Sequence, residues 1–275
     1  TMLVAQHNMG GFMKGILVKR LESSFYAFRK TVERFIESYD RFIAMSKTGK
    51  VYISKKVDVY DLLDDGNTEK LLYLIDQQDV MEFDVKEFDT QFFRDLQYDL
   101  AQLKAMQFIW DVLTTDPKLD EFKHNLKTNK LLKKKKVIVF TESRETAQYL
   151  YEELQEIYAD RIVCFSGQSS SALKIEIEDS FNPKFKNKDN DKYDLLITTD
   201  VLAEGINLHR ANVLINYDLP WNPTRIMQRV GRINRVGTEY DRIYVFNFFP
   251  TAQSKAHLPL EERILEKLQA FHDTL

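Results

Sequence analysis

The sequence predicts an α/β fold in which a parallel β-sheet carries helices on both faces and is preceded by a mainly helical region. Two observations lead to this prediction. After Lys133, short runs of Val, Ile, Leu and Phe alternate with amphipathic helical stretches, as in a parallel sheet that is buried on both faces. Before Lys133, apolar side chains recur mostly at helical spacing.

The helical region contains two clear amphipathic stretches. Residues 16–46 carry apolar side chains at helical spacing with charges on the other face, which predicts one long helix. Residues 88–113 return to the same period, and the Asp-Pro pair at 116–117 ends one helix and starts another. Between them, residues 51–85 mix a short β-rich run with an acidic turn and a Leu-rich helical stretch.

The sheet is expected to contain five strands. Their apolar runs lie at residues 137–140, 161–165, 195–199, 213–217 and 243–248. The polar, turn-rich segment 182–192 is expected to be an exposed loop, and residues 251–275 are expected to form a C-terminal helix. Ligands of a parallel sheet bind at the carboxyl ends of its strands, so polar residues at these positions are the candidates for function.

Composition excludes several classes of protein. No stretch reaches the roughly 18 to 20 consecutive apolar residues that a membrane-spanning helix needs, so we expect a cytoplasmic protein without a membrane partner. The single cysteine, Cys164, excludes an internal disulfide and fits a reducing compartment. The 39 Lys plus Arg against 42 Asp plus Glu give a formal net charge of −3, so any nucleic-acid binding must use a local patch.

Two short segments follow the first two expected strands. In KVIVFTESRETAQYLYEEL, Ser143 and Arg144 stand at the start of a helix, where a hydroxyl can cap the helix and exposed amides can hold a phosphate. In VCFSGQ, Gly167 would let the backbone approach a phosphate closely. An ordinary N-cap at Ser143 and a plain tight turn at Gly167 are the alternatives.

The longest informative segment is LLITTDVLAEGINLHRANVLINYDLPWNP, residues 195 to 223. Its candidate residues are Thr198, Thr199, Gly205, Asn207 and Trp221. The two threonines end a strand, where their hydroxyls can meet a ligand. A tryptophan packs in a core more often than it stacks on a base, so Trp221 taken alone stays open between the two roles.

A second segment, QRVGRINRVG, begins at Gln228 and carries Arg232 and Arg235 three residues apart. At helical spacing the two arginines share one face, so both can point into the same cleft. Phosphoryl transfer spreads negative charge over the γ-phosphate oxygens, and a planar guanidinium aimed at them neutralises that charge. A solvated basic helix is the alternative for this spacing taken alone.

In order and spacing, these segments resemble motifs IV, V and VI of the C-terminal RecA-like lobe of superfamily 2 helicases. The Asp-Leu-Pro-Trp-Asn-Pro ending resembles the Swi/Snf branch, and KGILVKRLESSFYAFRKTVERF at 14–35 is similar to bacterial Swi/Snf-like ATPases. The resemblance covers residues 14–47 and 114–249. Val236-Gly237-Thr238 departs from the usual ending of motif VI in eukaryotic Swi/Snf proteins.

The resemblance implies a role for each candidate. Nucleic-acid backbone contacts are implied at Ser143, Arg144, Gly167, Thr198, Thr199 and Trp221. Gly205, Asn207 and Gln228 would face the nucleotide, and Arg232 and Arg235 would be the catalytic arginine fingers. The implied activity is ATP hydrolysis that drives a DNA translocase or helicase, with double-stranded DNA favoured over single-stranded DNA. An RNA-dependent helicase lobe and a non-catalytic RecA-like binding module remain alternatives.

The chain lacks the other half of such an ATPase site. It has no Gly-rich loop with Lys and Ser/Thr to cradle phosphates, and no acidic pair to hold magnesium. We therefore expect ATP and Mg²⁺ to be held mainly by a first RecA-like lobe of the same parent chain. We also expect no metal ligands in this chain and no hydrolysis by this chain alone. The basic run at 130–136 is interpreted as a solvated face.

These expectations divide the chain into four parts. They are a helical segment at 1–50 that comes from the first lobe, a helical insertion at 51–113, the C-terminal RecA-like lobe at 114–250 and the C-terminal helix at 251–275. Because the sequence begins with Thr1 rather than Met, we expect it to be part of a longer polypeptide.

Overall fold

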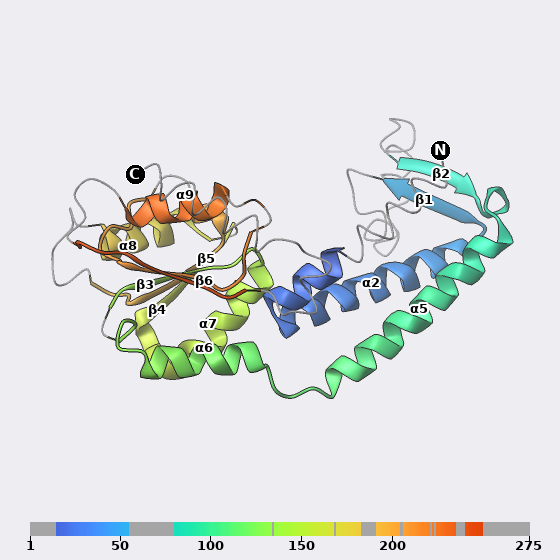
Figure 1. Ribbon diagram of the computed structural model, residues 1–275. Coiled ribbons are helices and arrows are strands. Elements are labelled where there is room, and N and C mark those ends of the chain that lie inside the picture. Colours follow the sequence, from blue (N-terminus) through green and yellow to red (C-terminus); the bar gives the residue numbers. More distant parts are fainter. Residues whose placement is uncertain are drawn as a thin grey trace. The chain divides into compact units, whose positions relative to one another are not determined.

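The computed structural model describes residues 15–54, 80–133, 135–167, 169–182, 191–203, 206–220, 222, 224–234 and 240–249. The chain forms two compact units, which are Thr1–Phe28 together with Thr115–Leu275, and Arg29–Thr114 (Figure 1). The expected helix at 251–275 and most of the expected loop at 182–192 lie outside the described residues.

A parallel sheet forms the centre of the first unit. Its strands are β3 (Val137–Phe140), β4 (Ile162–Phe165), β5 (Leu195–Thr198), β6 (Val213–Asn216) and β7 (Tyr244–Asn247), in the spatial order β4-β5-β3-β6-β7. The five expected strands are therefore confirmed. Every pairing is parallel, so the carboxyl ends of all five strands lie at one edge of the sheet.

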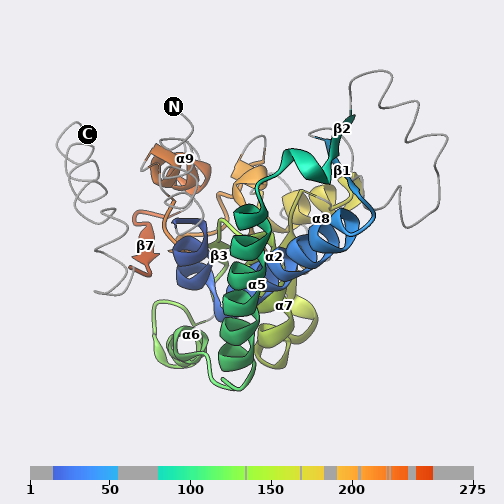
Figure 2. The ribbon, with the colours of Figure 1, turned by 90° about the vertical axis from the view of Figure 1, so that its right-hand side faces the viewer.

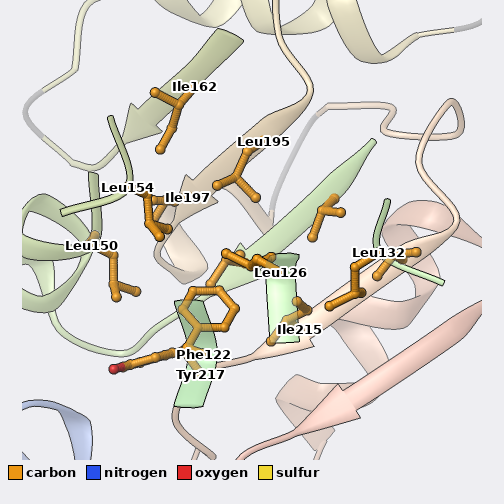
Figure 3. Packing of buried hydrophobic residues seen from close by; sticks show 14 of the residues in the cluster. Phe122, Leu126, Leu132, Leu150, Leu154, Ile162, Leu195, Ile197, Ile215 and Tyr217 are labelled. Atoms are coloured by element: carbon orange, nitrogen blue, oxygen red, sulfur yellow. The ribbon is translucent and has the colours of Figure 1, made fainter. Parts of the chain in front are cut away.

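Helices cover both faces of this sheet, as the unbroken apolar strands predict. The helices are α6 (Pro117–Thr128), α7 (Arg144–Tyr158), α8 (Ser171–Phe181) and α9 (Thr224–Ile233). One core joins α6 and α7 to one face, and a second core joins α8 and α9 to the other (Figure 1 and Figure 2). In the first core the ring of Phe122 lies 5.2 Å from that of Tyr217 (Figure 3). Successive side chains of a strand point to opposite faces, so a sheet buried on both sides needs continuous apolar runs.

In the second unit two antiparallel strands accompany the helices. β1 (Lys50–Ser54) pairs with β2 (Val80–Asp84), and a 3₁₀ turn, η1 (Val85–Glu87), leads towards α5 (Thr90–Asp111). The expected helical insertion at 51–113 is therefore helical only in part. Alternating β-branched and aromatic residues in β1 favour a strand, and the pairing with β2 completes it. This unit begins at Arg29, so the expected boundary at residue 50 lies inside it.

The single helix expected at 16–46 is broken at Ser24. One helix spans 15–23, and α2 (Phe25–Ser46) starts immediately after the break. The hydroxyl of Ser24 accepts a hydrogen bond of 3.0 Å from the backbone N–H of Ala27, as an N-cap does. Apolar spacing continues through this point, so periodicity alone does not reveal the break.

The end of the 15–23 helix is held by a lysine from α6. Lys118 Nζ donates hydrogen bonds to the carbonyl oxygens of Glu22 and Ser23, at the end of that helix. Its ammonium group also lies 4.2 Å from the centre of the Tyr217 ring. Burial lowers the pKa of Lys118 from its ordinary 10.5 to about 8, although Asp218, Glu22 and Asp116 favour the charged form.

This pKa predicts how the stability of the first unit changes with pH. Between about pH 8 and 10.5, the unfolded chain binds more protons at Lys118 than the folded chain does. The contribution of Lys118 to the free energy of unfolding should therefore increase as the pH rises through this window. We expect the unfolding free energy of the wild type minus that of Lys118→Met to increase from pH 7.5 to pH 9.5 in urea titrations. A difference that shrinks over this range contradicts the prediction, and Lys123→Met serves as the control.

Candidate functional site

The carboxyl edge of the sheet brings three polar turns together. Phe140, Thr198 and Asn216 are in register at the ends of β3, β5 and β6. Each strand is followed two residues later by a carboxylate, at Glu142, Asp200 and Asp218 respectively. The chain therefore places three acidic side chains at the edge where ligands of a parallel sheet bind.

Asp218 connects the turn after β3 to the 15–23 helix. Its carboxylate accepts hydrogen bonds of 2.6 Å from Thr141 Oγ1 and of 2.6 Å from the backbone N–H of Glu142. It also accepts one from Ser23 Oγ. Ser23 Oγ in turn lies 2.7 Å from Thr146 Oγ1, in the first turn of α7. A buried carboxylate is stable when such donors satisfy it. These hydrogen bonds therefore hold the 15–23 helix and the turn after β3 against Asp218.

Arg229 secures α9 to the same edge. Its side chain is 0% exposed, and its Nε and Nη2 donate to the two carboxylate oxygens of Asp200 at 2.7 and 3.1 Å. Nη1 donates to Asn216 Oδ1 at 2.8 Å, and the guanidinium lies 5.1 Å from the centre of the Phe140 ring. The planar fork of an arginine is suited to this paired contact, which compensates the buried charge.

Glu142 lies between α9 and the 15–23 helix. Its Oε2 pairs with Lys19 Nζ, while its Oε1 lies 3.3 Å from Arg225 Nη1 and 3.6 Å from Arg229 Nη2. The side chain is 9% exposed. Arg225 Nη1 also lies 3.2 Å from Asp200 Oδ2, so two carboxylates share three cations at this edge.

Ser143 caps α7, as one reading of the sequence predicts. Its buried hydroxyl accepts hydrogen bonds from Thr146 N at 3.2 Å and from Arg20 Nη1 at 2.8 Å, and it donates to Glu145 Oε2 at 3.0 Å. The hydroxyl is therefore satisfied inside the protein. Arg144, the first residue of α7, is exposed, and its side chain has no polar partner among the residues described.

The candidate threonines lie at the carboxyl end of β5. Thr198 is fully buried and donates its hydroxyl hydrogen to the carbonyl oxygen of Thr199 at 3.1 Å. Thr199 is buried as well. Gly167 is exposed, and a Cβ there would meet its nearest atom, Val201 Cγ2, at an ordinary 3.7 Å, so packing alone does not require a glycine.

The structure describes only some of the residues that are candidates for nucleotide binding or for arginine fingers. Gln228 is exposed on α9, and Asn207 is half-buried. Arg232 is half-buried on α9, and its guanidinium has no hydrogen bond or ion pair within the described part of the chain. Gly205, Trp221 and Arg235 lie outside the described residues.

Sequence reasoning assigned no role to Arg229, Asp200 or Asp218, although they form the centre of the site. A usable signal was present, since each acidic residue stands two positions beyond a buried strand. A buried carboxylate requires a cation or several donors, and Arg229 lies on the helix that follows.

A pocket of about 220 Å³ lies beside the site in the first unit. It is lined by Ile16, Lys19, Arg20, Ser23, Glu142 and Ser143. No cluster of three or more His, Cys, Asp or Glu side chains that could hold a metal ion occurs among the described residues. In the same part of the chain, no helix has the length and apolar character needed to cross a membrane.

Comparisons with known proteins bear on the first unit. Residues 117–237 match the family described as helicase conserved C-terminal domain. Over 136 residues the chain is 38% identical to the uncharacterized ATP-dependent helicase YqhH of Bacillus subtilis, covering 50% of this chain and 22% of that protein. Over 125 residues it is 35% identical to the ATP-dependent RNA helicase uap56 of Schizosaccharomyces pombe, covering 44% of this chain and 27% of that protein.

Among solved structures, the C-terminal part of the Fun30 ATPase domain is similar with a TM-score of 0.43 and 22% identity. That similarity covers 52% of this chain and 44% of the Fun30 chain. The chain thus corresponds to less than a third of the length of the two protein relatives.

The contrast between Arg229 and Arg225 gives a prediction for stability. Both bind Asp200, but Arg229 is 0% exposed and Arg225 is 51% exposed. Asp200→Ala would leave the Arg229 charge buried without its main partner, which should cost about 3 to 5 kcal/mol of unfolding free energy. Arg225→Met should cost less than about 1 kcal/mol. Urea unfolding of both variants measures this, and equal losses would contradict the assignment of Arg229 as the buried anchor.

Proposed function

Because residues 117–237 match the family described as helicase conserved C-terminal domain, we propose that this chain is the second motor lobe of an ATP-dependent DNA translocase or helicase. In this proposal Arg232 and Arg235 reach ATP that is held mainly by a first lobe. The chain itself supplies charge neutralisation, and the phosphate cradle and magnesium ligands come from that first lobe.

One observation carries the proposal. The Arg229 guanidinium is hydrogen-bonded to Asp200 and Asn216. Arg232, three residues further along α9, has no polar side-chain partner in the described part of the chain. The buried arginine thus sets the orientation of the helix, and the next arginine is left to bind an anion. A guanidinium held ready in this way stabilises charge that develops in the transition state without reorganisation at that moment.

Residues at the carboxyl edge would meet the nucleic-acid backbone. The exposed guanidinium of Arg144 would bind a phosphate, and the exposed Gly167 would let the strand approach closely. Ser143 and Thr198 would act by shaping their turns, since their hydroxyls already bond within the protein. Thr199, Gly205, Asn207, Trp221 and Gln228 keep the roles that the family resemblance implies.

The nucleic acid is proposed to be DNA. The Trp221-Asn222-Pro223 run resembles the Swi/Snf branch, which supports DNA and supports translocation over strand separation. RNA is the second candidate, because a relative with 35% identity is described as an RNA helicase. A non-catalytic binding module is the weakest alternative, since a degenerate module has no need of the Arg232 and Arg235 pair.

Turnover by the protein that carries both lobes tests the arginine assignment. Arg232→Lys should lower kcat on the order of 10³-fold, because a compact ammonium does not reproduce the planar fork. The affinity for ATP should change little, because an interaction made only in the transition state leaves ground-state binding alone.

Arg161→Lys is the matched control, because Arg161 pairs with Asp194 near the opposite edge of the sheet, and this variant should keep near-normal turnover. Near-normal turnover by Arg232→Lys would show that Arg232 is no finger. Arg229→Ala is unsuitable for comparison because it would destabilise the fold itself.

Stimulation of hydrolysis distinguishes the nucleic-acid candidates. Duplex DNA should stimulate ATP hydrolysis by the two-lobe protein more than single-stranded DNA or single-stranded RNA does. Stronger stimulation by RNA favours the second candidate.

Salt dependence of binding tests the role of Arg144. Arg144→Ala should weaken binding equally for all sequences and reduce the slope of log K against log salt by about one, as expected for the loss of one phosphate contact. An unchanged slope in Arg144→Ala removes Arg144 from the interface.

A further inference from the structure

We propose that Glu142 is a positioning residue that couples the 15–23 helix to α9, the helix that carries Arg232. This inference rests on the proposed function, because it concerns how the finger is placed. In this role Glu142 touches neither ATP nor nucleic acid and acts through the cations on either side of it.

The two carboxylate oxygens of Glu142 serve different elements. Oε2 pairs with Lys19 on the 15–23 helix, and Oε1 faces Arg225 at 3.3 Å and Arg229 at 3.6 Å on α9. The backbone N–H of Glu142 donates to Asp218 Oδ1 at 2.6 Å, which holds the residue in place. The Glu142 side chain is 9% exposed and that of Arg229 is 0% exposed, so solvent screens this pair weakly and screens the more exposed Lys19 and Arg225 more strongly.

The 15–23 helix is anchored at its C-terminal end, and its middle carries two cations. Lys19 pairs with Glu142, and Arg20 contacts Ser143 and Glu145 at the start of α7. Ser23 bonds to Asp218, and Lys118 binds the last carbonyl oxygens of the helix, so the C-terminal end stays with the sheet. Lys19 lies one helical turn before Ser23. A tilt of the helix about its anchored end would therefore change the distance between Lys19 and Glu142. The pocket of about 220 Å³ that both residues line gives the lysine room to move.

The charge on Glu142 is shared between the two helices. Lys19, Arg225 and Arg229 are three cations for the two carboxylates of Glu142 and Asp200. When Lys19 departs, more of the Glu142 charge acts on Arg225 and Arg229, and the balance of forces on α9 changes. Arg232 follows one turn later on α9, so its position responds to the position of the 15–23 helix.

Kinetics of the two-lobe protein tests the coupling. Lys19→Met and Glu142→Gln should each lower kcat by roughly tenfold, the range expected for a coupling between two elements, while KM for ATP stays nearly constant. Because the Lys19 effect passes through Glu142, the double variant should be no slower than Glu142→Gln alone. Lys123→Met is the matched control, since the Lys123 to Glu153 pair of 2.6 Å joins α6 to α7 without contacting α9, and it should leave kcat unchanged.

The outcomes distinguish failure of the Glu142 coupling from failure of the proposed function. Additive losses in the double variant, or normal kcat in Glu142→Gln while Arg232→Lys is inactive, would overturn the role of Glu142 alone. Normal turnover by Arg232→Lys would overturn the proposed function. Hydrogen exchange of the backbone amides at 224–233 covers the case of an unstable variant. Lys19→Met should speed exchange there and Lys123→Met should not, and unchanged exchange in Lys19→Met would also overturn the coupling.

Discussion

The buried guanidinium of Arg229 is the constraint on which the site depends. A fully buried charge is tolerated only when its partners are complete, and here they come from three strand ends: Asp200 after β5, Asn216 at the end of β6 and the ring of Phe140 at the end of β3. The strands must therefore be in register for α9 to dock. The same contact that stabilises the fold also determines where the following arginine, Arg232, lies.

Asp218 binds the 15–23 helix to the same edge of the sheet. By accepting hydrogen bonds from Ser23, Thr141 and the backbone of Glu142, it joins the turn after β3 to the 15–23 helix, although Asp218 itself lies 195 positions from Ser23 in sequence. The 15–23 helix is consequently part of the same compact unit as the sheet, although the resemblance assigned it to a preceding lobe.

At this edge of the sheet, residues of the same type have different roles. The resemblance implies nucleic-acid contacts for Ser143 and Thr198, yet their hydroxyls bond to groups of the protein itself, including Arg20 in the case of Ser143. Arg229 and Arg232 are three residues apart on one helix, yet Arg229 is fully buried and bonds to Asp200 and Asn216, whereas Arg232 is half-buried and has no polar side-chain partner among the residues described. Arginine spacing in a sequence does not distinguish these cases, because it contains no information about which acidic groups lie across the sheet.

Features of the fold that depend on neighbouring residues could be predicted from the amino-acid sequence. Continuous apolar runs predicted all five strands, the Asp116-Pro117 pair predicted the start of α6, and Ser143 was predicted as a possible cap of α7. The break at Ser24, the pairing of β1 with β2 and the burial of Arg229 became evident only from the folded chain. The reason is the distance in sequence between partners: periodicity and capping act over one or two helical turns, whereas Ser23 meets Asp218 across 195 positions.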